Sequence, residues 1–251
     1  MIHRATTCLC CCLMLTITLF STNELPAADQ KPTTIVTFGD STTAPRGPLV
    51  VYSAILAKEL PQQGVPVNVI NAGIGGNTTQ NAVARFEKDV LAKQPDLVVI
   101  QFGINDSAVD VWKNPPATKS RVSKKQYEAN LRSLIDELQK RKIKVILMTS
   151  NSLRWIPRIK KLYGKPPYDA EDPQGFNLFL KDYAQSVREI AREKQVPLVD
   201  IYKAFEEYGK QPGQSTDDLL LDGIHPNTAG QRKVADLLIP QIKATLSPPQ
   251  K

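Results

Sequence analysis

The side chain best suited to transfer a proton lies in a short acidic segment near the carboxyl end of this chain. The sequence has two histidines, and only His225 lies beyond the first thirty residues. His225 follows Asp222 by three positions in the run Asp-Gly-Ile-His-Pro. An imidazole shuttles protons near neutral pH, and one loop can present a carboxylate to its ring at this spacing. We therefore expect histidine-dependent chemistry to converge on this loop.

A serine near the amino end is the matching nucleophile. The apolar run from Thr34 to Phe38 ends in Gly-Asp-Ser, which places Ser41 at the carboxyl end of a predicted first strand. Catalytic groups gather at such ends in open α/β sheets. A serine hydroxyl is a weak nucleophile alone, so His225 is predicted to accept its proton while Asp222 orients the imidazole.

Two further loops offer donors for the negative charge that develops in acyl transfer. The run Asn-Ala-Gly-Ile-Gly-Gly-Asn contains Gly76, and the run Gly-Ile-Asn-Asp contains Asn105. The backbone N–H groups of Ser41 and Gly76 and the side-chain amide of Asn105 are the predicted oxyanion donors. Each block alone is weak evidence, because such residues are common in turns and helix caps. Together they supply every part of an acyl-transfer site.

At these four blocks the chain resembles the SGNH hydrolases, also called GDSL-type esterases and lipases. The four lettered residues of that family match Ser41, Gly76, Asn105 and His225, with Asp222 in the family's Asp-x-x-His arrangement. The resemblance runs from about residue 33 to 246. It implies a three-layer flavodoxin-like α/β fold with a five-stranded parallel sheet. It also implies ester hydrolysis through an acyl-serine intermediate, with neither a metal nor another cofactor.

One position departs from the family's name-giving motif. Thr42 stands where the leucine of Gly-Asp-Ser-Leu would be, a variant that looks like that of rhamnogalacturonan acetylesterases. The Gly76 and His225 blocks are more similar to those of the lysophospholipase and thioesterase branch. The resemblance therefore leaves the substrate class open between these branches.

Apolar runs and helical periodicity alternate along the chain. Buried strands are predicted at Thr34–Phe38, Val67–Ala72, Leu97–Phe102, Lys144–Met148 and Pro197–Ile201. Because predicted strands and helices alternate along the chain, we expect a mainly parallel sheet covered on both faces.

The helices between these strands are predicted from apolar spacing. One has a face formed by Val83, Phe86, Val90 and Leu91, and another has a face formed by Tyr127, Leu131, Leu134, Ile135 and Leu138. Helices are also expected at Pro48–Leu60, at about Phe176–Lys194, and from Thr228 onward, the last interrupted by Pro240.

Length and composition fit one globular domain behind an export signal. The chain has 251 residues, of which 41% are hydrophobic and 23% charged. Residues 1–28 have a basic start, an apolar stretch and a small-residue end, so we interpret them as a secretory signal peptide and residues 29–251 as the hydrolase domain. A retained membrane anchor is the alternative, although the apolar stretch is short for a span. The expected location is periplasmic or extracellular.

The cysteines all lie within this signal, at Cys8, Cys10, Cys11 and Cys12. We therefore expect a mature protein with no disulfide, no thiol nucleophile and no cysteine zinc site.

The formal net charge of +7 is concentrated in three runs, at 119–125, 140–144 and 154–165. Solvated helix faces and loops explain the first two runs. Affinity for an acidic polysaccharide or an anionic surface is the sharper alternative. No nucleic-acid motif accompanies these charges, so nucleic acid is not an expected partner.

The segment from 151 to 175 is the best remaining indication of the substrate. It has no clear periodicity and is rich in proline, and long irregular connections in compact domains are usually functional or mobile. Its aromatic and basic residues suit sugar rings and acidic groups, and the candidate substrate contacts are Trp155, Arg158, Tyr163 and Tyr168. The alternative is a surface loop whose aromatic side chains pin it to the domain.

Three functional classes remain open from the sequence. The leading hypothesis is a serine esterase on short-acyl, acetyl-type esters of small molecules or polysaccharides. The second is a lysophospholipase or acyl-thioesterase, and the third is a non-catalytic carbohydrate-binding protein on the same fold. A metalloenzyme is disfavoured, since one histidine and no cysteine beyond the predicted signal leave only carboxylate-rich sites. Asp40 and Asp106 are interpreted as loop-stabilising acceptors. The sequence does not indicate the oligomeric state.

Overall fold

The structure is a computed structural model that describes residues 1–2 and 31–247. The predicted signal peptide at 1–28 falls almost entirely outside the described residues. The domain from residue 31 onward forms one compact unit. Within the described part of the chain, no helix combines the length and the apolar character that crossing a membrane requires.

Five parallel strands form the predicted sheet, and its flavodoxin-like fold is confirmed. The strands are β1 (Thr33–Gly39), β2 (Val67–Gly73), β3 (Leu97–Gln101), β4 (Lys144–Met148) and β5 (Leu198–Val199). Their boundaries follow the apolar runs closely, because a strand covered on both faces reads as a continuous run of β-branched and aliphatic residues. The last strand is shorter than predicted, since Asp200 already caps the next helix.

The strand order explains where a site can form. The sheet runs β2-β1-β3-β4-β5, and all four pairings are parallel. The chain therefore leaves β1 toward β2 and then crosses back to β3 on the other side of β1. Gly39 pairs with Gly73 on one side and Gln101 on the other, so three strands end at one level. Such a switch point leaves a crevice beyond the carboxyl ends of the strands.

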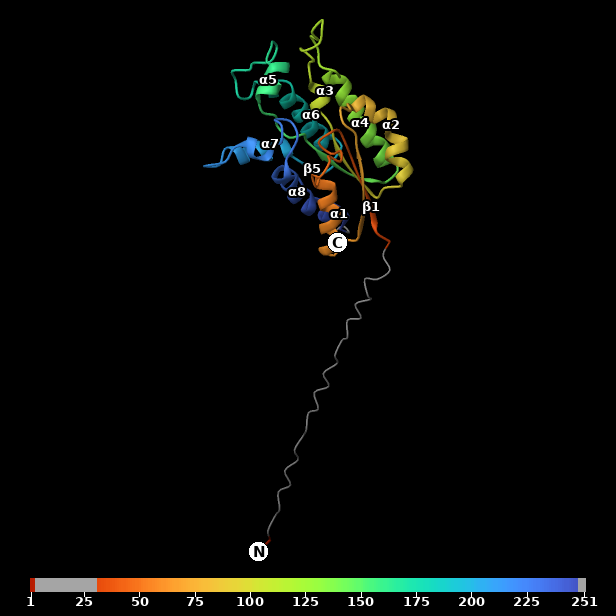
Figure 1. Cartoon of the computed structure of the whole chain (residues 1–251). Coiled ribbons are helices and arrows are strands. Elements are labelled where there is room, and N and C mark those ends of the chain that lie inside the picture. Colours follow the sequence, from red (N-terminus) through yellow and green to blue (C-terminus); the bar gives the residue numbers. More distant parts are fainter. Residues whose placement is uncertain (3–30, 248–251) are drawn as a thin grey trace. The chain divides into compact units, whose positions relative to one another are not determined.

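Helices cover both faces of the sheet, giving three layers. The α-helices are α1 (Tyr52–Gln62), α2 (Thr79–Asp89), α3 (Ile104–Ser107), α4 (Lys124–Lys140), α5 (Pro157–Tyr163), α6 (Leu180–Glu193), α7 (Ile201–Gly209) and α8 (Thr228–Leu246). Helices α2, α4 and α6 pack on one face, with Phe38, Val98 and Leu147 among the strand residues they cover. Helices α1, α7 and α8 pack on the other face, over Ile35 and Val99. Figure 1 shows α2 and α4 on the opposite side of β1 from α1 and α8.

The last helix corrects one prediction, because α8 continues through Pro240 to Leu246. A proline removes one backbone hydrogen bond and crowds the preceding turn, which usually breaks a helix. Here Leu238, Ile239 and Ile242 are buried against α1 and the sheet, so tertiary packing holds the helix together on both sides of the proline. The predicted interruption is wrong for that reason.

Other corrections concern helix faces and missed helices. Val83, predicted to face the core, is 42% exposed, and the preceding Ala82 is buried instead. The segment 151–175, predicted to be irregular, contains α5, which begins with a proline at its first position. Helix α7 is absent from the sequence prediction, because its apolar positions follow the last strand without a turn signal.

Candidate active site

Ser41 lies in a tight turn directly after β1. The carboxylate of Asp40 accepts hydrogen bonds from the backbone N–H and the hydroxyl of Thr42, at 2.9 and 2.8 Å. The carbonyl of Asp40 accepts from the N–H groups of Thr43 and Ala44, so the chain folds back within four residues. A side chain at Gly39 would overlap that of Thr43, so glycine is required where the strand enters this turn. The Ser41 side chain is left half-buried at the top of the sheet.

Hydrogen bonds join Ser41, His225 and Asp222 in a continuous chain. The imidazole Nε2 lies 2.9 Å from the Ser41 hydroxyl, and Nδ1 lies 2.8 Å from one Asp222 oxygen and 3.0 Å from the other. Asp222 also accepts the backbone N–H groups of Ile224 and His225, which fixes the loop that precedes α8. The three-residue spacing therefore places the Asp222 carboxylate within hydrogen-bonding distance of the imidazole Nδ1.

The environment of Asp222 keeps its carboxylate ionised. Burial alone would raise the pKa of Asp222, but the hydrogen bonds from the His225 side chain and backbone and from Ile224 lower it well below its usual range. An ionised carboxylate on Nδ1 leaves Nε2 as the acceptor that faces Ser41.

Asn105 and Gly76 border the same position from two other loops. Asn105 lies in α3, the short helix after β3, and its amide nitrogen donates to the carbonyl of Asn77 at 3.1 Å, with a weaker contact to Asp40 at 3.5 Å. Gly76 has a φ of +76°, a backbone conformation that favours glycine. A Cβ built on the adjacent Gly75 would lie 3.9 Å from the Cβ of Ser41, so this loop passes beside the serine.

Two buried carboxylates support these loops from below. Asp40 and Asp106 are both fully buried, and Asp106 accepts the backbone N–H and hydroxyl of Thr79 at the start of α2. Burial raises the pKa of Asp40 and raises that of Asp106 to about 6, against the opposing effect of the threonine hydrogen bonds. Both side chains act as the loop-stabilising acceptors that the sequence predicted. Among the described residues, no group of three or more His, Cys, Asp or Glu side chains is arranged to hold a metal ion.

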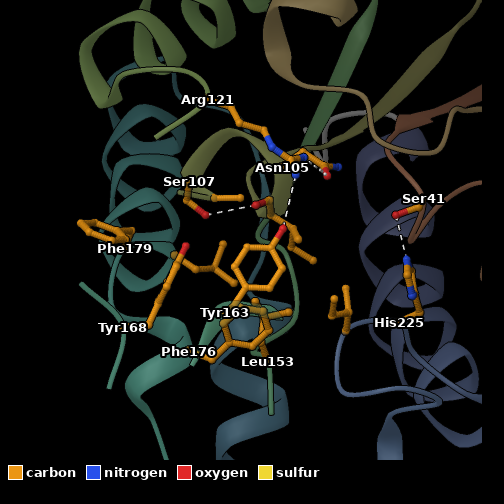
Figure 2. A pocket seen from close by; sticks show the side chains of 14 residues that line it. Ser41, Asn105, Ser107, Arg121, Leu153, Tyr163, Tyr168, Phe176, Phe179 and His225 are labelled. Atoms are coloured by element: carbon orange, nitrogen blue, oxygen red, sulfur yellow. Dashed lines mark hydrogen bonds between the residues drawn. The ribbon is translucent and has the colours of Figure 1, made fainter. Parts of the chain in front are cut away.

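A cavity of about 160 Å³ opens beside Ser41 and His225. Its polar end carries these two residues with Asn105 and Arg121, and Figure 2 shows Ser41 and His225 on the opposite side of the cavity from a group of aromatic side chains. The rest of the lining is mainly apolar and consists of Ile104, Ser107, Ala108, Leu153, Tyr163, Tyr168, Phe176, Phe179, Leu180 and Ile224. We call Tyr163, Tyr168, Phe176 and Phe179 the aromatic wall.

Only half of the predicted substrate contacts reach this cavity. Tyr163 and Tyr168 line it, whereas Trp155 stacks on Phe176 with ring centroids 4.7 Å apart and donates its N–H to the carbonyl of Asp172. Arg158 is exposed on α5 and is not among the lining residues.

The charges of this segment also differ from the prediction. Arg154, counted among its basic residues, is largely buried in an ion pair with Glu206 at 2.8 Å and donates to the Thr216 hydroxyl. It is therefore not free to bind an acidic ligand. The aromatic residues both pin the segment to the domain and line the cavity, so the two alternatives drawn from the sequence are not exclusive.

The sequence does not identify several lining residues, of which Arg121 is the most informative. It belongs to the basic run at 119–125, for which a solvated surface is the simpler interpretation, yet its guanidinium bonds Asn105 and Asp110. Phe176 and Phe179 are expected from the sequence only at the start of a helix. Their spacing beside Leu180 is an apolar stripe that could have indicated a packed wall.

Comparisons with known proteins agree with this arrangement. Residues 37–233 match the model of the GDSL-like Lipase/Acylhydrolase family. The chain is 35% identical over 226 residues to the uncharacterized lipoprotein YqeF of Bacillus subtilis (strain 168), covering 80% of this chain and 85% of that protein. It is 32% identical over 191 residues to an acetylxylan esterase of Geobacillus stearothermophilus, covering 75% and 77%.

Solved structures of esterases and acylhydrolases also match the chain. The crystal structure of Axe2, an acetylxylan esterase from Geobacillus stearothermophilus, superposes with a TM-score of 0.67 at 29% identity, covering 84% of this chain and 94% of that one. A lipase/acylhydrolase from Enterococcus faecalis superposes with a TM-score of 0.65 at 30% identity, covering 87% and 100%. From the fold, the arrangement of the four blocks and these matches, the chain belongs to the GDSL-like lipase/acylhydrolase family and is a carboxylic ester hydrolase of the SGNH type.

Proposed function

We propose that Ser41 is the nucleophile of this hydrolase, His225 its general base and acid, and Asp222 the residue that orients His225. The observation that carries this proposal is the unbroken chain of hydrogen bonds from the Ser41 hydroxyl through both ring nitrogens to the Asp222 carboxylate. Each link is between 2.8 and 3.0 Å, which is the geometry that proton transfer requires.

The proposed reaction proceeds in two halves. Ser41 attacks the ester carbonyl as its proton moves to His225 Nε2, and the tetrahedral intermediate expels the alcohol, which takes the proton from His225. A water then attacks the acyl-serine in the same way and releases the carboxylic acid and the free serine. Asp222 stabilises the imidazolium that forms in each half.

The developing oxyanion is proposed to bind the N–H groups of Ser41 and Gly76 and the amide of Asn105. Within residues 31–247, neither of these backbone N–H groups has a hydrogen-bond acceptor, so both are available. Preplaced donors of this kind stabilise the transition state because no reorganisation is needed as charge develops.

For the substrate, we propose short-acyl esters, of the acetyl type, on carbohydrates. The cavity, at about 160 Å³, is similar in size to the ~150 Å³ engineered cavity that binds benzene, so it can hold one six-membered ring. Its aromatic wall offers ring faces, and Arg121 and Tyr163 place polar groups at the edge. Relatives named acetylxylan esterase, at 32% and 27% identity, support the same substrate class.

A lipid or thioester substrate is the second candidate. The aliphatic part of the cavity, formed by Leu153, Leu180 and Ile224, could receive an acyl chain. Relatives named esterase TesA, from Pseudomonas aeruginosa, and thioesterase 1/protease 1/lysophospholipase L1, from Escherichia coli, match at 27% and 25% identity.

Acyl-chain length separates these two candidates. The experiment is hydrolysis of a p-nitrophenyl ester series from acetate to palmitate, and of acetylated xylooligosaccharides, by wild type and Ser41→Ala. Activity that is greatest on acetate and on the acetylated sugar supports the carbohydrate proposal. A maximum at eight or more carbons, with no release of acetate from the sugar, supports the lipid candidate.

We also propose that the protein is exported, with residues 1–28 as a cleaved signal and a polysaccharide or small-molecule ester as its partner. A relative named as a lipoprotein supports export. Mass analysis of the intact protein from cells tests this: a mass that begins near residue 29 is expected, and a full-length mass would contradict it.

A further inference from the structure

We propose that Arg121 is a positioning residue that holds the amide of Asn105 in the orientation an oxyanion donor needs. This inference rests on the proposed function, because it concerns the donor set of the proposed acyl transfer. It adds a residue that lies outside the four sequence blocks of the family.

Arg121 contacts Asn105 with one arm of its guanidinium and Asp110 with the other. Its Nη1 donates to Asn105 Oδ1 at 3.0 Å, while Nη2 donates to Asp110 at 2.7 Å and Nε donates to both Asp110 oxygens at 3.1 Å. Asp110 is only 3% exposed. Burial by itself would raise the pKa of Asp110, but Arg121 and Lys113 lower it overall. The rigid fork of a guanidinium that is paired with a buried, ionised carboxylate therefore fixes where Nη1 points.

The contacts of the Asn105 amide select one orientation. A guanidinium offers only donors, so it requires the oxygen of the amide, and the Asn77 carbonyl offers only an acceptor, so it requires the nitrogen. A flipped amide would face a donor with a donor and an acceptor with an acceptor. Arg121 and Asn77 thus keep the nitrogen on the side of Asp40 and Ser41, where, within residues 31–247, its second hydrogen has only the 3.5 Å contact to Asp40.

The backbone ties the two residues to the same framework. The N–H of Arg121 donates to the carbonyl of Ala108 at 3.0 Å, and the next N–H, of Val122, donates to the carbonyl of Asp106 at 3.1 Å. These acceptors lie three residues and one residue beyond Asn105. The connection to α4 therefore runs along α3, and backbone hydrogen bonds hold Arg121 next to the helix that carries Asn105.

The positive charge of Arg121 has a second effect on the Asn105 amide. A cation on Oδ1 polarises the amide and makes the opposite N–H a stronger donor to a negative oxygen. Arg121 also lines the cavity, with 30% of its side chain exposed, so direct binding of substrate is the competing role. Figure 2 shows Arg121 joined to Asn105 on one side, with the Tyr163 hydroxyl beneath it.

A double-mutant cycle with p-nitrophenyl acetate separates these roles, because this ester has no sugar to contact Arg121. Arg121→Ala is expected to lower kcat about tenfold with KM changed less than about twofold, since a positioned donor is lost only in part. In an Asn105→Ala background the same substitution is expected to change kcat less than about twofold, because the group it acts through is gone. Arg121→Lys is expected to restore part of the loss, because it retains the charge without the fork.

Lys113→Ala is the matched control. Lys113 also pairs with Asp110, at 2.8 Å, but it does not touch Asn105, so kcat is expected to stay within about twofold of wild type. If Arg121→Ala fails to fold, as judged by its thermal transition, the cycle is run with Arg121→Lys. Ser41→Ala sets the background rate for all variants.

The positioning role is overturned if Arg121→Ala lowers kcat equally with and without Asn105, if it changes KM alone, or if it changes neither. The proposed function fails separately, and takes this inference with it, if wild type hydrolyses the ester no faster than Ser41→Ala.

Discussion

The polar end of the cavity and the aromatic wall differ in their effects on the free energy of folding and on the reaction. The polar end holds a half-buried serine and histidine above two fully buried carboxylates, and burial raises the pKa of both acids. The aromatic wall is a packed cluster in which Tyr168 and Phe176 touch each other and Tyr163. We infer that the polar end favours reaction at a cost in folding free energy, and that the wall stabilises the domain while it shapes the cavity.

Removing the proposed nucleophile should have the largest effect on rate and little effect on stability. Ser41→Ala is expected to lower kcat by about four to six orders of magnitude, since the proposed covalent step is lost. Its thermal transition should stay within a few degrees of wild type, because the Ser41 side chain is small and only half-buried. Steady-state kinetics and a melting curve check both statements. Adding His225→Ala should reduce kcat no further, since the two residues are proposed to act as a unit; an additional large loss would contradict that.

Removing an oxyanion donor should have the next largest effect. Asn105→Ala is expected to lower kcat by about 10² to 10³, the usual cost of losing one such donor, with a smaller change in KM. Asn105→Asp serves as the control of equal size, and it should be at least as impaired because an ionised carboxylate donates no hydrogen bond. Near-normal turnover by Asn105→Asp would exclude the donor role.

Substituting the buried carboxylate of Asp106 tests whether the polar end lowers the free energy of unfolding. Because its pKa of about 6 is raised above its usual value, the folded state binds more protons than the unfolded state between about pH 4 and 6. This group therefore lowers the free energy of unfolding as pH rises through that window. Asp106→Asn cannot titrate, so its stability relative to wild type should rise by up to about 3 kcal/mol from pH 4 to pH 7.

Denaturant titrations of wild type and Asp106→Asn at several pH values measure this difference. The substituted amide would keep an oxygen for the two Thr79 donors, but its NH2 group would replace the Asp106 oxygen that has no hydrogen-bond partner. The cost of burying that group does not depend on pH, so the change in the stability difference with pH isolates the charge. A stability difference that does not change with pH would show that Asp106 does not titrate in this range.

The wall should show the opposite behaviour, with an effect on stability rather than on rate. The Tyr168 hydroxyl accepts the backbone N–H of Val109 at 2.8 Å inside the wall. Tyr168→Phe leaves that buried donor unpaired and should lower the free energy of unfolding by about 1 to 3 kcal/mol. Turnover of p-nitrophenyl acetate should change less than about threefold. A large loss of kcat without a loss of stability would assign Tyr168 to the chemistry instead.

The same contrast explains what could be predicted from the sequence. The polar end depends on short spacings, such as the three residues from Asp222 to His225, and on apolar runs that end at Ser41 and Asn105. These features are local, and the parallel sheet brings the strand ends together. The five strands were predictable for the same reason.

The wall and Arg121 depend on contacts between distant parts of the chain. Arg121 reaches Asn105 only because the connection after α3 folds back along that helix, and no periodicity in residues 107–123 indicates this. Likewise, Pro240 remains helical because α8 packs against α1 and the sheet, a tertiary effect that overrides local preference.

The most direct test of the central claim is to label the nucleophile. An activated organophosphate ester, such as a diethyl p-nitrophenyl phosphate, phosphorylates a serine whose proton a neighbouring base accepts, with release of the p-nitrophenolate. Intact mass and peptide mapping should show one diethylphosphoryl group on Ser41 in wild type and none at that position in His225→Ala. Labelling of another residue, or of Ser41 at an equal rate without His225, would contradict the account.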